Sequence, residues 1–263
     1  SQPLPLIRHI PTAESEGEAA WIPPVHKKDH KPSYNHRDAV PPSLREAILS
    51  FILVCAARRL RGSGTKHNSM LVHVTRFNDV QERVEHQVKH ELKGIVDRLR
   101  VRTADRDLLL ELRAAWDRFA HTTKAIAARG DGIFKNPYHA WEEIEGEILA
   151  AASAISVRTI NGLAGGVLDY DEHREDGLSV IAIGGDKLSR GLTLEGLSVS
   201  YFLRCSRMYD TLMQMGRWFG YRPGYLDLCR LYTTRELCEW FGHIATATEE
   251  LRQDFELMVQ SGA

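Results

Sequence analysis

Two stretches in the last third of the chain hold residue types that could bind a phosphate-containing ligand. In the first, Val180–Gly196, an apolar run leads into paired glycines, an Asp-Lys pair and then Ser-Arg-Gly. Glycines at the carboxyl end of a strand let the backbone approach a ligand closely, and open α/β sheets bind their ligands at that edge. A plain β-turn with solvated charges is the alternative explanation of this pattern.

The second stretch, Tyr209–Gly224, is rich in glycine, aromatic residues and arginine. Arg217 and Arg222 stand five residues apart, and guanidinium groups bind phosphoryl oxygens in a bidentate manner. This spacing suits a phosphate clamp, although surface arginines stacked on aromatic rings would have the same pattern. Residues 204–235 contain six arginines and two acids, namely Arg204, Arg207, Arg217, Arg222, Arg230 and Arg235 with Asp210 and Asp227.

The hydrophobic pattern predicts the elements that would position these stretches. Five strands are predicted from short β-rich runs at 69–75, 156–160, 179–183, 197–203 and 226–232. Apolar residues at helical spacing between the first two runs predict a helical insertion over about 79–152. The predicted fold class is therefore α/β, a parallel sheet of about five strands flanked by helices, with the insertion after the first strand.

The first 42 residues contain eight of the ten prolines and little apolar periodicity. We therefore predict a proline-rich arm or interdomain linker over residues 1–40, held down by Trp21 and Ile22, and a main domain over residues 41–263. The segment Ser43–Glu46 has the spacing of a capping box, which predicts the start of an apolar helix that ends near Gly62.

The order of a strand, an Asp-x-x-Ser-Arg-Gly turn, another strand and a Gly-Arg pair resembles the C-terminal RecA-like domain of superfamily-two helicases. Asp186–Gly191 is similar to the fifth helicase motif, and Gly216-Arg217 is similar to the core of the sixth. The amino-acid sequences of Ile183–Leu197 and Gln214–Arg222 more specifically resemble the Z-one domain of helicase-like ATPases from bacterial restriction and anti-phage systems. The resemblance covers about residues 40–245.

This resemblance implies an ATP-driven subunit that translocates on double-stranded DNA and works with a nuclease subunit. It also implies an arginine finger, which could be either Arg217 or Arg222, together with residues that contact the nucleotide and residues that contact nucleic acid. The nucleotide contacts would be Gly185, Asp186, Arg190, Gly191 and Gly216, and the nucleic-acid contacts would be Lys187, Ser189, Arg204 and Arg207.

The chain contains no Gly-x-x-x-x-Gly-Lys-Ser/Thr phosphate loop. In motors of this type, the first RecA-like domain supplies the phosphate loop and the Mg²⁺ site, and the second supplies arginines to the transition state. We therefore expect ATP and Mg²⁺ to be bound jointly with an N-terminal RecA-like ATPase domain of the same protein. The fragment alone is predicted to be catalytically inactive.

Two alternatives from other functional classes remain open. The first is an inactive RecA-like docking module, anchored to a nuclease or ATPase partner by aromatic residues of the second stretch: Trp218, Phe219, Tyr221 and Tyr225. The second is a metal-dependent endonuclease using the acidic cluster at Asp169, Asp171, Glu172 and His173. His86 and His90 lie one helical turn apart but lack a third ligand, so a solvated helix face is favoured and no metal site is predicted.

The formal net charge of -1 excludes a globally basic nucleic-acid-binding protein, so any such surface must be a local patch. One such patch could be the helical insertion, where basic side chains interleave with acids; they are Lys89, Lys93, Arg98, Arg100 and Arg102. The four cysteines form no C-x-x-C pair, and no apolar run is long enough to cross a bilayer. We therefore expect a cytoplasmic protein without membrane partners.

Overall fold

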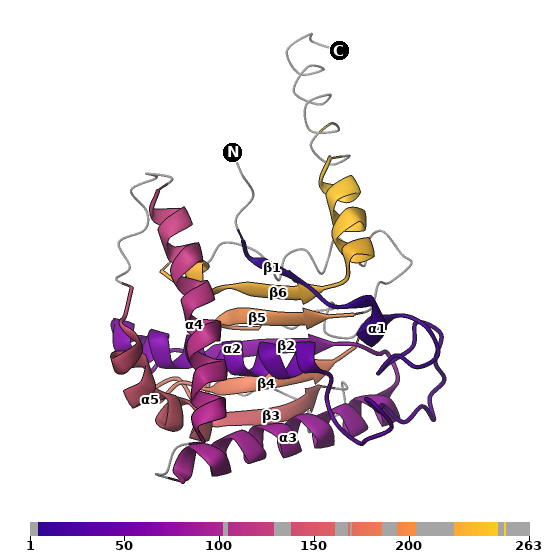
Figure 1. Ribbon diagram of the computed structural model, residues 1–263, viewed down its shortest axis with the longest axis horizontal. Coiled ribbons are helices and arrows are strands. Elements are labelled where there is room, and N and C mark those ends of the chain that lie inside the picture. The colour runs from indigo at the N-terminus through magenta and orange to yellow at the C-terminus, as the bar shows by residue number, and fades with distance from the viewer. Residues whose placement is uncertain are drawn as a thin grey trace.

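The computed structural model places six parallel strands in one sheet, in the order β1-β6-β5-β2-β4-β3 (Figure 1). It describes residues 5–101, 105–128, 138–160, 168, 170–185, 194–203, 224–246 and 250. The strands are β1 (Ile7–His9), β2 (Asn68–His73), β3 (Ile155–Ile160), β4 (Ser179–Gly184), β5 (Leu197–Phe202) and β6 (Arg230–Thr233). Because all pairings are parallel, the carboxyl ends of the strands meet at one edge.

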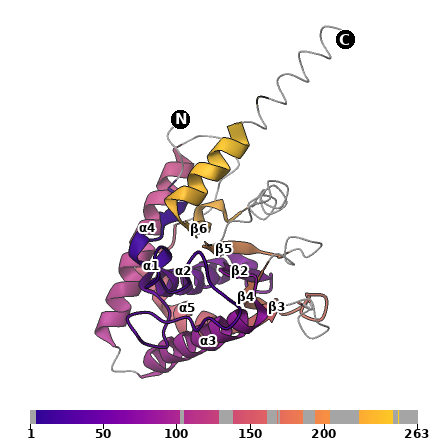
Figure 2. The same ribbon diagram turned by 90° about the vertical axis from the view of Figure 1, so that its right-hand side faces the viewer.

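The long helices described lie together on one face of the sheet (Figure 2). They are α2 (Pro42–Arg58), α3 (Asn78–Arg100), α4 (Arg106–Ala127) and α5 (Trp141–Ser153); shorter turns are α1 (Thr12–Ser15), η1 (Arg59–Ser63) and η4 (Leu226–Leu228). Helix α2 is buried along nearly its whole length, because it packs against the sheet on one side and against α4 and α5 on the other. Its apolar residues therefore surround the helix instead of forming one stripe.

The opposite face of the sheet has a smaller apolar cluster. Leu71, Val180 and Leu197 from the strands contact Tyr170 and Leu178, which precede β4. Leu237 and Phe241 also pack there, from a helix over residues 235–246, and the Phe241 ring lies 6.1 Å from that of Phe202. Both faces of the central strands are thus covered, which explains why these strands are continuous hydrophobic runs.

The predicted fold class is confirmed, with one strand more than expected. Helices α3, α4 and α5 form the insertion between β2 and β3, and the inward residues Trp141, Ile144 and Ile148 of α5 are buried as the periodicity predicts. The run 226–232 divides into the short turn η4 and strand β6. The sixth strand, β1, is too short to leave a β pattern in the sequence, and it comes from the first 40 residues.

Residues 5–40 are held on the sheet and α3 by specific polar contacts. β1 pairs with β6, and the indole of Trp21 is fully buried, donating a hydrogen bond to Gln87 Oε1 at 2.9 Å. The amide of the same glutamine donates to the carbonyl of Pro32 at 2.7 Å and to the carboxylate of Asp38 at 2.6 Å. One buried side chain of α3 therefore fixes three points of the proline-rich segment.

The predicted capping box at Ser43 is wrong. Pro41 is the N-cap of α2, and both the amide and the hydroxyl of Ser43 donate to the carboxylate of Glu14, at 3.1 and 2.5 Å. The Ser43 hydroxyl also lies 2.8 Å from the hydroxyl of Tyr201, whose pKa is raised because the phenol is buried. The carboxylate of Glu14 in α1 thus accepts the Ser43 amide, which Glu46 would accept in a capping box.

None of the helices in the part of the chain that the structure describes is long and apolar enough to span a membrane.

Candidate functional site

Both stretches with candidate ligand-binding residues continue from the carboxyl edge of the sheet. Val180–Gly196 runs through β4, which ends at Gly184, and the arginine-rich stretch follows β5, which ends at Phe202. Strands β4 and β5 are the two neighbours of β2 in the sheet. The two segments therefore start on either side of the central strand, two strand spacings apart.

The ends of β2 and β5 form the switch point of this topology. The strand that follows β2 in the chain, β3, lies in one direction along the strand order. The strand that follows β5, which is β6, lies in the opposite direction. Ligands of open α/β sheets bind where such connections diverge. At this position His73 of β2 pairs in register with Phe202 of β5, and their rings stack with centroids 4.8 Å apart.

His73 is fully buried, which is unusual for a histidine, and it lies outside the two predicted stretches. The signal that could have found it is an imidazole directly after the apolar run Met70–Val72. His73 and Phe202 form the last pair between β2 and β5, so the His73 ring lies at the switch point, where the chain leaves both strands.

Gly185 is the one predicted nucleotide-binding residue that the structure describes, and its backbone is closely packed. A Cβ atom there would lie 2.7 Å from Gln81 Nε2 and 3.0 Å from the carbonyl oxygen of Thr75. The Gln81 amide donates to that same carbonyl at 3.0 Å. The glycine therefore allows the end of β4 to approach the end of β2 and the start of α3.

The carboxyl edge also has buried polar atoms that could receive a hydrogen bond from a ligand. Gln81 Oε1, beside Gly185, and Thr233 Oγ1, at the end of β6, have no hydrogen-bond partner within the part of the chain that the structure describes. Buried polar atoms are nearly always hydrogen-bonded, so such atoms call for an explanation. Both atoms lie at the carboxyl edge, which is where open α/β sheets bind their ligands.

Replacing Gly185 by alanine is expected to destabilise the protein by about 1–3 kcal/mol, because the new methyl group would displace the buried Gln81 amide and break its hydrogen bond. Thermal unfolding should show a Tm lower by several degrees. The matched control is Gly94→Ala in α3, where a Cβ meets nothing within 4 Å and helix propensity favours alanine. A Gly185→Ala variant as stable as the wild type would contradict this packing.

The N-terminal segment reaches the same edge through His26. One ring nitrogen of His26 lies 2.7 Å from Thr75 Oγ1, just beyond the end of β2, and the ring packs edge-on against Phe77. The Thr75 hydroxyl also accepts the amide of Phe77 at 3.2 Å. His26 thus connects residues 5–40 to the segment that leads from the central strand into α3.

The remaining predicted site residues lie outside the described residues. They are Asp186, Lys187, Ser189, Arg190, Gly191, Arg204, Arg207, Gly216, Arg217 and Arg222. Their roles stay predictions.

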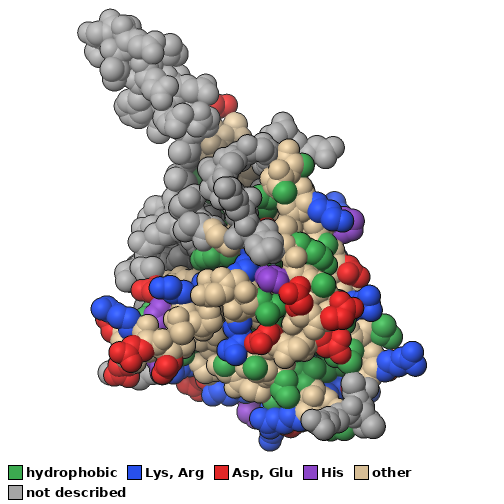
Figure 3. All heavy atoms as spheres, turned by 90° about the vertical axis from the view of Figure 1, so that its left-hand side faces the viewer, with side chains coloured by type: hydrophobic (Ala, Val, Ile, Leu, Met, Phe, Trp, Pro, Cys, Tyr) green, Lys and Arg blue, Asp and Glu red, His purple; other side chains and the backbone are tan. Residues whose placement is uncertain are grey.

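Two charged residues counted in the arginine-rich stretch lie at the opposite, amino edge of the sheet. Asp227 is 0% exposed, and both its oxygens accept from the Arg61 guanidinium at 2.9 and 2.6 Å. Arg230 is buried over the ring of Phe119, 3.8 Å from its centroid, and burial lowers the pKa of its guanidinium to about 10. These residues are structural and belong to no phosphate clamp. Acidic and basic side chains are interspersed over the amino-edge side of the molecule (Figure 3).

Tyr225, an aromatic residue of the proposed docking surface, is also engaged inside the fold. It packs against the main core, and the guanidinium of Arg58 lies 4.3 Å from its ring centroid. Burial is the main reason why the pKa of Arg58 is lowered. Tyr225 is therefore unsuited to anchor a partner, whereas Trp218, Phe219 and Tyr221 lie outside the described residues.

The described residues give no support to a metal site. His86 and His90 are exposed on α3, as a solvated helix face predicts, and Asp171 forms an exposed ion pair with Arg174. No group of three or more His, Cys, Asp or Glu side chains that could hold a metal ion occurs among the residues the structure describes. Glu91, next to His90 on α3, pairs with Arg45 of α2.

The family model of the Z1 domain matches residues 43–263, which is most of the chain. The chain belongs to the Z1 domain family. The resemblance to the Z-one domain is thereby confirmed, and the match includes both candidate stretches. Comparisons with curated proteins and with solved structures gave no match. The Z1 match begins at the second residue of α2, so the arm that Gln87 holds on the domain precedes it.

Proposed function

We propose that this Z1 domain is the C-terminal motor half of an ATP-dependent, DNA-translocating helicase-like subunit. Membership of the Z1 family favours a subunit of a restriction or anti-phage defence system. The observation that carries the proposal is that the two motif-bearing stretches start from the same edge of the sheet. They follow β4 and β5, on either side of β2, at the carboxyl edge where open α/β sheets bind ligands.

In this proposal the domain contributes half of an ATP site. Arg217 or Arg222 reaches across an interdomain cleft to the γ-phosphate, where negative charge develops during transfer. The first stretch contacts the nucleotide through Gly185, Asp186, Arg190 and Gly191, with Gly216 from the second. The phosphate loop and the residues for Mg²⁺ come from an N-terminal RecA-like domain of the same protein.

DNA contacts are proposed for side chains next to the nucleotide contacts. Lys187 and Ser189 lie within the first stretch, and Arg204 and Arg207 follow β5 directly in the chain. Because both kinds of contact share short segments, a change in nucleotide state would move the DNA contacts. A nuclease subunit would then act on the DNA that the motor translocates.

The test is steady-state ATP hydrolysis by the intact parent protein, with and without duplex DNA, compared with residues 1–263 alone. We expect the parent protein to hydrolyse ATP faster when DNA is present and the isolated chain to be inactive. A parent protein that does not hydrolyse ATP under either condition would refute the motor. Hydrolysis by the isolated chain would refute the division of the site between two domains.

A further inference from the structure

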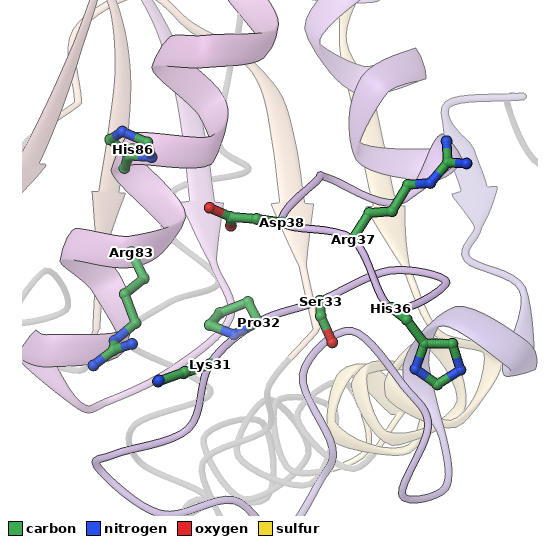
Figure 4. A pocket seen from close by; sticks show the side chains of 8 residues that line it. All are labelled: Lys31, Pro32, Ser33, His36, Arg37, Asp38, Arg83 and His86. Carbon is green, nitrogen blue, oxygen red and sulfur yellow. The ribbon is translucent and has the colours of Figure 1, made fainter.

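A pocket of about 320 Å³ lies between the N-terminal segment and α3 (Figure 4). Residues 31–38 form one wall, and Arg83 and His86 of α3 form the other. Its residues belong to neither of the two motif-bearing stretches. Its wall is built from two parts of the chain that are about 50 residues apart, so only the folded protein contains it.

The charge in this pocket is predominantly positive. Lys31, Arg37 and Arg83 are cationic, with the Arg37 side chain pointing away from the other two in Figure 4, and Asp38 is the only acid that lines it. The Asp38 carboxylate already accepts a hydrogen bond from the Gln87 amide at 2.6 Å. Lys31 and Arg83 lie on the same side of the pocket in Figure 4, and neither forms an ion pair within the part of the chain that the structure describes.

The wall formed by the N-terminal segment is fixed before any ligand binds. Tyr34 and Arg37 exchange two backbone hydrogen bonds of 3.0 Å around a tight turn, in which Asn35 and His36 adopt positive φ angles of 50° and 60°. Gln87, which is 3% exposed, holds the chain on either side of this turn through Pro32 and Asp38. A preformed wall reduces the entropy that a ligand must offset on binding.

We propose that this pocket binds a phosphate group. Lys31 and Arg83 line one pocket without forming ion pairs, so an anion bound there is attracted by both charges. A lysine and an arginine together suit a phosphate, because the guanidinium fork and the ammonium group can donate to different phosphoryl oxygens. The proposal is independent of the ATPase proposed above, since it involves none of the same residues.

The phosphate can come from free inorganic phosphate or from the backbone of a nucleic acid. Helix α3 distinguishes the two sources, because its exposed face continues to Lys93, about 15 Å beyond Arg83 at 1.5 Å per residue. Lys93 lines a second hollow of about 290 Å³ beside β3 and is too far from Arg83 to share one phosphate ion. A nucleic-acid strand would contact both Arg83 and Lys93, whereas free phosphate would contact Arg83 but not Lys93.

The experiment uses the full chain and four variants with exposed substitutions: Lys31→Ala, Arg83→Ala, Lys93→Ala and the control Arg113→Ala, an exposed arginine of α4. Inorganic phosphate is titrated by NMR at constant ionic strength, and labelled duplex DNA by fluorescence anisotropy at several salt concentrations. Tm values confirm that each variant is folded. We expect Lys31→Ala and Arg83→Ala to weaken phosphate binding about tenfold, because each removes a charge-assisted hydrogen bond, and Arg113→Ala to leave it unchanged.

If the nucleic-acid backbone is the source, Arg83→Ala and Lys93→Ala will each lower the slope of log K against log salt for DNA by about 1. If free phosphate is the source, only phosphate binding will change, and only in Lys31→Ala and Arg83→Ala. Either result supports the pocket. Wild-type affinities for both phosphate and DNA in all variants, or no binding of either by the wild type, would overturn it.

Discussion

Replacing Arg217 or Arg222 by alanine in the intact parent protein is expected to lower kcat for ATP hydrolysis by on the order of 10³, for whichever of the two is the finger. The reason is that charge develops on the transferred phosphoryl group, so the arginine stabilises the transition state more than bound ATP. The KM for ATP should therefore change little. Steady-state assays of both variants, with and without duplex DNA, would identify the finger.

The matched control is Arg235→Ala, because Arg235 belongs to the same arginine-rich stretch but is exposed at the start of the helix over residues 235–246. It should hydrolyse ATP at the wild-type rate. Loss of DNA stimulation in one finger variant and not in the control would support the motor. Full activity in both finger variants would contradict the assignment and favour a domain that docks a partner or grips DNA.

Replacing Asp227 by alanine is expected to destabilise the folded protein by about 3–5 kcal/mol. The carboxylate is fully buried, it receives two hydrogen bonds from Arg61, and Thr123 donates a third at 2.9 Å. The Arg61 side chain is itself only 6% exposed, so the substitution removes a bidentate carboxylate partner from a buried charge. Urea unfolding should show a lower midpoint with a similar slope.

Asp171→Ala provides a control at the same hydrogen-bond distance. Asp171 and Arg174 also lie 2.6 Å apart, but the side chain of Asp171 is 90% exposed, and exposed ion pairs contribute little to stability. The double variant Arg61→Met with Asp227→Leu should recover much of the loss, because it removes both buried charges together. Equal unfolding midpoints for Asp227→Ala and Asp171→Ala would show that burial of the pair does not have the predicted effect.

The sequence predicted the elements of this fold well where the pattern is local. The apolar residues of α3 recur at three- and four-residue spacing, and those of β4 form a continuous run, so each segment identifies its own periodicity. The sequence predicted β1 poorly, because three residues at the edge of a sheet carry too little pattern. It also misassigned the cap of α2, whose partner Glu14 lies 29 residues away in the chain.

In the candidate site, too, the sequence predicted the contiguous motifs but not the long-range contacts. The sequence alone identified the Z1 family and the stretches around Gly185 and Arg217, because motifs of this kind are contiguous. The sequence did not indicate His73 or Gln81, because each is defined by a contact with another strand end. His73 stacks on Phe202 at the end of β5, and Gln81 lies against Gly185 after β4. Strand order in a sheet cannot be read from the order of strands in the chain.

What the sequence by itself determined is therefore the class of fold, the family and the location of the motifs. Only the tertiary structure decided which charged residues are structural. Arg230 belongs to the arginine-rich stretch that suggested a phosphate clamp, but it is buried over the ring of Phe119. Asp227, from the same stretch, pairs with Arg61, 166 residues away in the chain. Local periodicity records which face of an element is apolar, whereas the partner of a buried charge depends on long-range packing. The pocket between residues 31–38 and α3 exists for the same reason.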